Sequence, residues 1–299
     1  HASGHLFMQP GAAGSTEPAP AQRRQRIHAR DGVGGGLVVL HRQGTVEVFG
    51  VRQYIEAMWN PMRQALSWAR QLPGRCQVCG RWPAQPVCAP CLHRLHTPPH
   101  RCSRCARPLQ TDSALCGACL VQQPPAAVVQ CAAALDYRYP WDGLIARWKF
   151  GGETGWSDFW AGLMLADPTA QTLWRQCAFV VPVPMGPRGL ARRGYNQAWE
   201  LVKALQRHQP GPQPLAQGLV RLRETAEQHS LPRAERLRNL HGAMAAHPHA
   251  AMALVDAHVL LVDDVRTTGA TLEAAAQALL AAGAGRVSAL VLARTPEPD

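Results

Sequence analysis

Strand-like and helix-like patterns alternate through the second half of the chain. Residues 259–262 form an uninterrupted apolar run, which is typical of a strand buried on both faces. Residues 271–282 favour a helix that stops at Gly283, and residues 286–294 indicate the next strand. Further strands are expected at 132–137 and 179–183, with helices near 142–149, 156–166 and 190–207. This order predicts βαβ units over residues 126–299, an α/β fold with a largely parallel, twisted sheet flanked by helices.

The first 123 residues lack this pattern. Residues 1–57 are rich in Gly, Ala and Gln without a sustained period, so we interpret them as disordered or as foreign to the native chain. Two runs inside them, 37–40 and 45–51, could pair as short strands, although nothing in the pattern requires it. Residues 58–123 form a second region, which begins with a short amphipathic helix expected at 61–70. Pro124 and Pro125 link it to the α/β region.

Composition narrows the protein class. The chain has 299 residues and a net charge of +11, and Lys149 and Lys203 are its only lysines. An arginine-rich surface attracts phosphates through planar, bidentate hydrogen bonds, although a biased base composition of the gene would also enrich arginine. No apolar run approaches the ~18 residues of a membrane span, and no secretory signal is recognisable. We therefore expect a cytoplasmic protein without a transmembrane segment.

Eight of the ten cysteines form four Cys-x-x-Cys pairs. Two such pairs place four thiolates around one tetrahedral Zn²⁺, so eight ligands predict two closed, structural zinc sites. Pairing in sequence order is the simplest arrangement, but an interleaved pairing also fits. The repetition argues against redox catalysis and leaves an iron–sulfur cluster as the less favoured alternative. The predicted ligands are Cys76, Cys79, Cys88, Cys91, Cys102, Cys105, Cys116 and Cys119.

Arginines alternate with these cysteine pairs. A solvated basic face is the favoured interpretation, and nucleic-acid contact is the alternative. The two remaining cysteines, Cys131 and Cys177, lie in apolar contexts and are expected in the core. The arginines are Arg75, Arg81, Arg94, Arg101, Arg104 and Arg107.

Two adjacent carboxylates, Asp263 and Asp264, follow the strand at 259–262, and a Thr- and Gly-rich segment then precedes the last helix. Glycine allows the backbone to approach a phosphate, and a helix N-terminus offers unpaired N–H groups. Carboxylates suit ribose hydroxyls or a bound Mg²⁺. A simple helix cap is disfavoured, because two adjacent carboxylates after an apolar strand are costly without a partner. The sequence therefore predicts a sugar-phosphate site, and we call residues 267–271 the phosphate loop.

This segment resembles the phosphoribosyl diphosphate motif of type I phosphoribosyltransferases, and the wider pattern resembles the ComF family of competence proteins. The matching stretches are 148–150 (Trp-Lys-Phe), 181–184 (Val-Pro-Val-Pro) and 192–197, where Tyr195 replaces the Phe common in the family. A further stretch carries Arg223, Thr225, Gln228, Leu231, Arg236 and Asn239 at the family spacing. The resemblance covers about residues 70–296. It implies a type I phosphoribosyltransferase-like fold preceded by a small Cys₄ zinc-ribbon module.

The resemblance also implies roles for single residues. Asp263 and Asp264 would face the ribose, directly or through Mg²⁺, and would form the catalytic set with Arg192 and Arg193. Arg188 and Lys149 would contact phosphate groups, although Lys149 could equally extend from an amphipathic helix into solvent. The 5′-phosphate would lie on Thr267, Thr268, Gly269, Ala270 and Thr271. A mobile lid, or alternatively a polar surface loop, would carry Arg221, Arg223, Gln228 and Arg236.

Three functions remain open from the sequence. The first is Mg²⁺-dependent transfer of ribose 5-phosphate from phosphoribosyl diphosphate to an acceptor that the sequence does not identify. The second is handling of internalised single-stranded DNA during natural transformation, together with competence-machinery proteins, as the family resemblance implies. The third is regulatory binding of phosphoribosyl diphosphate without turnover.

Overall fold

A computed structural model describes residues 37–42, 45–50, 74–223 and 242–296, and all structural statements concern these residues. The chain divides into two compact units, His1–Leu72 and Pro73–Asp299, which are described separately. In the first unit, β1 (Leu37–Arg42) and β2 (Thr45–Gly50) pair as antiparallel strands, the pairing that the sequence allowed without requiring it. The helix expected at 61–70 lies outside the described residues.

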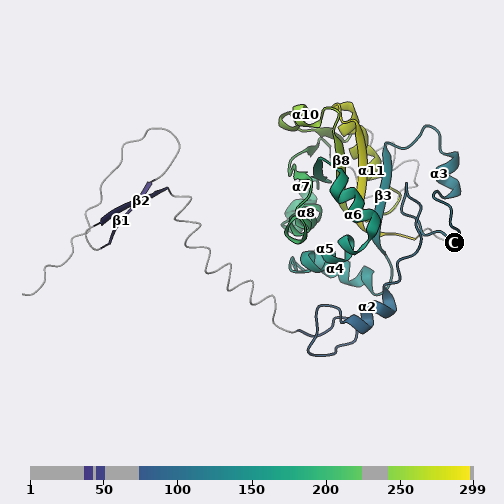
Figure 1. The fold of residues 1–299 in the computed structure, drawn as a ribbon, viewed down its shortest axis with the longest axis horizontal. Coiled ribbons are helices and arrows are strands. Elements are labelled where there is room, and N and C mark those ends of the chain that lie inside the picture. Colours follow the sequence, from purple (N-terminus) through teal and green to yellow (C-terminus); the bar gives the residue numbers. More distant parts are fainter. Residues whose placement is uncertain (1–36, 43–44, 51–73, 224–241, 297–299) are drawn as a thin grey trace, which may run out of the picture. The chain divides into compact units, whose positions relative to one another are not determined.

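The second unit is built on a sheet of five parallel strands in the order β3-β9-β8-β4-β5. Figure 1 labels β3 and β8 of this sheet and the helices around it. The strands are apolar almost throughout because helices cover both faces of the sheet. A short antiparallel pair, β6 (Leu219–Arg221) and β7 (Met244–Ala246), lies outside this sheet. The parallel α/β fold is confirmed. The sheet strands are β3 (Val128–Asp136), β4 (Phe179–Pro182), β5 (Gln213–Pro214), β8 (His258–Arg266) and β9 (Arg286–Arg294).

Successive residues of a β-strand point to opposite faces of the sheet, so alternate side chains pack into two hydrophobic cores. Leu260 and Leu290 belong to one core, which is covered by α4 (Trp141–Phe150), α5 (Trp156–Ala166), α6 (Pro168–Gln176) and α8 (Gln197–His208). Leu261 and Val291 belong to the other core, which is covered by α10 (Pro248–Leu254) and α11 (Ala270–Ala281). The first core is rich in tryptophan, with Trp148, Trp160 and Trp174 fully buried.

The expected helix at 190–207 is wrong in one respect, because the structure has two helices there. The first, α7 (Pro187–Arg193), ends at Gly194, whose φ of 77° lies in the left-handed region that glycine tolerates. Asn196 then caps α8, its side chain accepting a hydrogen bond from the Ala198 amide at 3.0 Å. Gly194 and Asn196 are residue types that favour a helix C-terminus and an N-cap, so the sequence carried a signal of this break that the helical pattern overrode.

Two strand boundaries and one helix also differ from the prediction. β8 continues beyond the apolar run and includes both carboxylates, ending at Arg266. β3 begins at Val128, four positions earlier than expected. The helix α6 was not predicted, although Asp167 marks its start by accepting a hydrogen bond from the Ala170 amide at 2.8 Å. Among the described helices, none is long and apolar enough to cross a lipid bilayer.

Candidate functional site

The phosphate loop joins the carboxyl end of β8 to the amino end of α11. Gly269 is the residue before the helix, and its φ of 84° requires glycine there. The Gly269 position provides no side-chain cap for the helix, and Thr268 Oγ1 accepts from the Ala270 amide at 3.3 Å. The remaining amides of the first turn have no intrahelical acceptor, as in every helix N-terminus. This arrangement can bind an anion.

The two carboxylates lie one residue apart at the end of β8 and are electrostatically coupled. Burial and the neighbouring Asp264 carboxylate raise the pKa of Asp263 to about 7, although the Asp264 amide donates a hydrogen bond to Asp263 at 2.8 Å. Lys149 Nζ on α4 lies 3.0 Å from Asp264 Oδ1, and each side chain is only 13% exposed. Besides the Lys149 ammonium, a second cation such as a divalent metal ion would be stabilised beside the two carboxylates.

Lys149 therefore does not extend into solvent from an amphipathic helix. Its ammonium group points to the carboxylate pair, so the structure brings together the 148–150 stretch and the end of β8, more than 100 positions apart. Gln197 Nε2 also donates to the Lys149 carbonyl oxygen at 3.3 Å. The helix that carries the lysine is thus fixed to the start of α8.

The stretch 192–197 mainly connects other parts of the site. The Tyr195 hydroxyl donates to the Trp148 carbonyl oxygen, and Asn196 Nδ2 donates to the Val183 carbonyl oxygen at 3.0 Å. These contacts attach the α7–α8 turn both to α4 and to the end of β4. The polar residues after Gly194 therefore position the site, a role that the sequence pattern did not distinguish from ligand binding.

The arginines expected in the catalytic set, Arg192 and Arg193, and the one expected to contact phosphate, Arg188, differ in their surroundings. Arg193 Nη1 donates to Gln197 Oε1 at 3.0 Å, and its guanidinium lies 4.8 Å from the centre of the Phe150 ring. Arg192 lies 5.7 Å from the same ring and is exposed. Arg188, on the first turn of α7, is also exposed. Of the three, Arg193 is close enough to lower the pKa of Asp263, after the larger effects of burial, Asp264 and Lys149.

The residues expected in a lid are only partly described. Arg221 ends β6, opposite Met244 of β7, and Arg223 follows two positions later. Gln228 and Arg236 lie outside the described residues, as do Thr225, Leu231 and Asn239. The lid role stays a prediction.

The eight cysteines form two clusters in sequence order. The first cluster contains Cys76, Cys79, Cys88 and Cys91, and the second contains Cys102, Cys105, Cys116 and Cys119. Within each cluster the four sulfur atoms lie within 4.8 Å of one another. The sequential pairing is therefore the one that the fold adopts, with the short helices α2 (Ala89–Leu95) and α3 (Gly117–Val121) beginning at the second pair of each cluster.

The thiol chemistry of both clusters fits a bound cation. Burial would raise the pKa of Cys76, but the amides of Cys88, Cys79 and Val78 donate to its sulfur and lower the pKa to about 6. In the same cluster, burial and the neighbouring sulfur atoms raise the pKa of Cys91 to about 12. One thiolate therefore forms easily, and the next ones require a positive charge among them. A tetrahedral Zn²⁺ supplies that charge.

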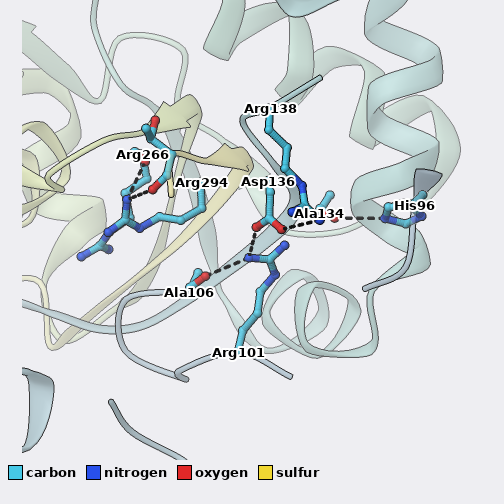
Figure 2. Close-up of polar contacts among 9 residues, drawn as sticks. His96, Arg101, Ala106, Ala134, Asp136, Arg138, Arg266 and Arg294 are labelled. Atoms are coloured by element: carbon cyan, nitrogen blue, oxygen red, sulfur yellow. Dashed lines mark hydrogen bonds and ion pairs between the residues drawn. The ribbon is translucent and has the colours of Figure 1, made fainter. Parts of the chain in front are cut away.

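Each cluster is attached to the outer side of β3, the edge strand of the sheet. His96, which follows α2, hydrogen-bonds through Nε2 to the Ala134 carbonyl oxygen at 3.0 Å. The Ser103 carbonyl oxygen in the second cluster accepts from the Cys131 amide at 2.8 Å. Arg101 completes the attachment, because its Nη1 donates to Asp136 at 2.8 Å and to the Ala106 carbonyl oxygen at 3.1 Å (Figure 2).

Two arginines that sequence reasoning missed lie beside the phosphate loop. Arg266 ends β8 and is paired in register with Arg294, which ends β9. Arg294 is 5% exposed, and its Nη1 donates to the carbonyl oxygens of Thr267 at 2.6 Å and Arg266 at 3.4 Å (Figure 2). Arg294 ends the strand predicted at 286–294, whereas Arg266 lies beyond the strand predicted at 259–262. The two arginines meet because β8 continues to Arg266 in register with β9.

A cavity of about 670 Å³ separates the second cluster from the start of the phosphate loop. Its described lining contains four arginines, three threonines and three ligand cysteines, but no Asp or Glu. The charge of this wall suits an anionic ligand. The arginines are Arg104, Arg107, Arg266 and Arg294, and the threonines are Thr267, Thr268 and Thr295.

Comparisons with known proteins agree with this architecture. A family model described as "Phosphoribosyl transferase domain" matches residues 189–298. DNA utilization protein YhgH of Escherichia coli (strain K12) is 32% identical over 233 residues, which cover 75% of this chain and 98% of that protein. Competence protein F of Haemophilus influenzae is 30% identical over 216 residues, which cover 70% of this chain and 90% of that protein. Competence protein ComFC of Bacillus subtilis (strain 168) is 30% identical over 225 residues, with 71% and 86% covered.

The three relatives match 70–75% of this chain, so the likeness is not limited to one short motif. The cysteine clusters fit a double zinc ribbon, and the domain behind them is of the phosphoribosyltransferase type. The chain belongs to the ComF family of phosphoribosyltransferase-like proteins.

Proposed function

We propose that this protein binds phosphoribosyl diphosphate, or ribose 5-phosphate, together with Mg²⁺ at the end of β8. The observation that carries the proposal is the coupled carboxylate pair, Asp263 and Asp264, directly before a glycine turn and a helix N-terminus. The amides of the phosphate loop would hold the 5′-phosphate, and the carboxylates would hold the ribose hydroxyls and the metal ion. Mg²⁺ would neutralise charge on the diphosphate.

The chain's own groups could also support transfer of the ribose 5-phosphate group. An acceptor atom would form a bond to C1 of the ribose while the bond from C1 to the diphosphate oxygen breaks, and the acceptor would lose its proton. Arg193 and Lys149 lie beside the carboxylates, where positive charge would stabilise the departing diphosphate. The acceptor is not part of the proposal, so binding without turnover belongs to the same site.

The relatives suggest the cellular setting. Their names describe DNA utilization and competence, and this chain covers nearly the whole length of the Escherichia coli protein. We propose that the phosphoribosyl site of this protein operates in the uptake and use of DNA in the cytoplasm, together with other competence proteins.

The test is a calorimetric titration with phosphoribosyl diphosphate in the presence and absence of Mg²⁺. We expect saturable binding that weakens at least tenfold without the metal ion, because the diphosphate and the two carboxylates would otherwise repel each other. Ribose 5-phosphate, which lacks the diphosphate, should bind more weakly and depend less on Mg²⁺. Absence of binding by both ligands would contradict the proposal.

A second candidate function, contact with single-stranded DNA, is favoured by the arginine-lined cavity. Arginine side chains bind backbone phosphates, and the cavity wall also contains apolar residues, including Ala118, Val121 and Pro296, against which a base could pack. The absence of carboxylates from the described lining removes a source of repulsion. This function is compatible with a phosphoribosyl site beside the cavity.

Titration of a fluorescent oligothymidylate across salt concentrations tests this second candidate. If the cavity binds the strand, replacing Arg107 with Gln should weaken binding and reduce the slope of log affinity against log salt by about 0.7, the value for one phosphate contact of a single strand. Arg94→Gln is the matched control, because Arg94 is exposed beside the first cluster and does not line the cavity. Equal slopes for both variants would exclude the cavity as the site of contact.

A further inference from the structure

The side chain of Arg266 lies directly on the glycine turn of the phosphate loop. A Cβ atom placed on Gly269 would lie 2.7 Å from Arg266 Nη2, 2.9 Å from Cζ and 3.0 Å from Nε. These distances are shorter than van der Waals contact, so the guanidinium occupies the space that a side chain at position 269 would need. The turn and the guanidinium are therefore packed against each other.

The same guanidinium also faces the second cysteine cluster. Arg266 shares the wall of the 670 Å³ cavity with Cys105, Cys116 and Cys119. The side chain thus lies between the loop and the cluster.

The charge of a loaded cluster would complement this arginine. Zn²⁺ with four thiolates carries a net charge of about −2, whereas four neutral thiols carry none. Arg266 Nε and Nη1 are buried without a hydrogen-bond partner among the described residues. A buried guanidinium in such surroundings depends on a nearby negative charge, because desolvation is otherwise costly.

We propose that Arg266 is a positioning residue that couples the second cluster to the phosphate loop. A metal-loaded cluster attracts the guanidinium and keeps it on the Gly269 turn, which holds the loop amides in the conformation that accepts a phosphate. Loss of the metal releases the guanidinium and loosens the turn. The expected effect of Arg266 on ligand affinity rests on the proposed function, whereas its expected effect on the order of the phosphate loop does not. By linkage, phosphate binding then also strengthens metal retention in the second cluster.

Hydrogen–deuterium exchange on the full zinc-loaded chain tests the coupling without any ligand. Peptides covering residues 266–271 are followed in the wild type, in Arg266→Gln and in Cys119→Ser, which removes a ligand from the second cluster. We expect exchange of the loop amides to become about tenfold faster in each variant, in line with ordinary coupling strengths. In the double variant the effects should not add, because both changes break the same connection.

Two control variants and one zinc measurement make the outcome specific. Cys91→Ser damages the first cluster in the same way and should leave loop exchange unchanged. Arg266→Lys keeps the charge and should restore part of the protection, whereas a purely steric role would not be rescued. Arg266→Gln should retain two zinc ions per chain, which excludes general unfolding. Equal loop exchange in wild type and Arg266→Gln, or fully additive effects in the double variant, would overturn the proposal.

Affinity for phosphoribosyl diphosphate with Mg²⁺ provides a second readout. Arg266→Gln should weaken binding 5- to 150-fold, roughly the range of ordinary coupling between two sites. If the wild type does not bind this ligand at all, the proposed function fails, while the exchange measurement still decides whether Arg266 couples the cluster to the loop. If the wild type binds and the variant binds equally well, the coupling fails and the proposed function stands.

Discussion

Replacing Cys102 with Ser is expected to reduce the zinc content from two ions to one per chain and to unfold the segment around the second cluster. Among the described residues, the other apolar side chains packed against that cluster are Leu109 and Leu115, which are partly buried. Such a core cannot stabilise a folded segment, so the metal must supply most of the free energy, about 10–16 kcal/mol for a structural zinc site. Metal analysis and limited proteolysis between residues 101 and 121 measure the two effects.

Cys177→Ser is the matched control for this variant. Cys177 is buried but belongs to neither cluster, and burial raises its pKa to about 12, so it remains a neutral thiol. The control should keep two zinc ions and resist proteolysis between residues 101 and 121. Retention of both zinc ions in Cys102→Ser would contradict a four-thiolate second site. Iron in place of zinc in the wild type would instead support an iron–sulfur cluster.

Replacing Asp264 with Asn is expected to weaken Mg²⁺-dependent binding of phosphoribosyl diphosphate by about 100-fold. Asn has nearly the same shape as Asp, but it removes a negative charge that would face the metal ion. The substitution also leaves the Lys149 ammonium, whose side chain is only 13% exposed, without its carboxylate partner. The loss of one charged hydrogen-bonding partner, about 1.5–3 kcal/mol, corresponds to roughly this factor. The calorimetric titration of the wild type, repeated on the variant, measures it.

Asp256→Asn provides the control, because Asp256 is exposed and precedes β8 at the opposite end of the strand. Its φ of 56° suits Asn as well as Asp, so the change should leave both fold and binding intact. Unchanged affinity in Asp264→Asn would remove this carboxylate from the site.

The pH dependence of binding gives an independent readout of the same carboxylate pair. Burial and the Asp264 carboxylate raise the pKa of Asp263 to about 7, so Asp263 is protonated in mildly acidic solution and cannot serve a metal ion well. Affinity should therefore rise by up to tenfold per pH unit below pH 7 and level off above it. Asp263→Asn should flatten this profile.

Protein stability should change in the opposite direction. The native state keeps the Asp263 proton up to about pH 7, whereas the unfolded chain releases it near pH 4, so the native state binds more protons in this window. The contribution of Asp263 to the free energy of unfolding therefore falls as pH rises from about 4 to about 7. Urea unfolding of wild type and Asp263→Asn at several pH values would detect the difference.

Strong local signals made much of the fold predictable. The strand at 286–294 has the predicted bounds, and the apolar run at 259–262 lies inside β8, because strands buried on both faces are recognisable without knowledge of their neighbours. The break at Gly194 was missed because the helical pattern continues across it, although glycine and Asn196 are residue types that end and cap helices. Local sequence therefore predicts a strand or helix well where the residues of that element alone determine its pattern.

The candidate site was predictable only where its residues are contiguous. Asp263, Asp264 and the phosphate loop form one stretch, whereas the contact of Lys149 with Asp264 depends on how α4 packs beside β8. Arg266 and Arg294 meet because the parallel register aligns the ends of β8 and β9, which no linear pattern reveals. Pairing of the cysteines was equally undetermined, because spacing alone permits both the sequential and the interleaved arrangement.

The attachment of both clusters to β3 has a consequence for the chain without metal. β3 is an edge strand, and an uncovered edge presents backbone groups that can pair with another chain. Here His96 and Ser103, one beside each cluster, cover that edge through the Ala134 carbonyl oxygen and the Cys131 amide. In a cell short of zinc, chains without metal are therefore expected to expose this edge and to self-associate.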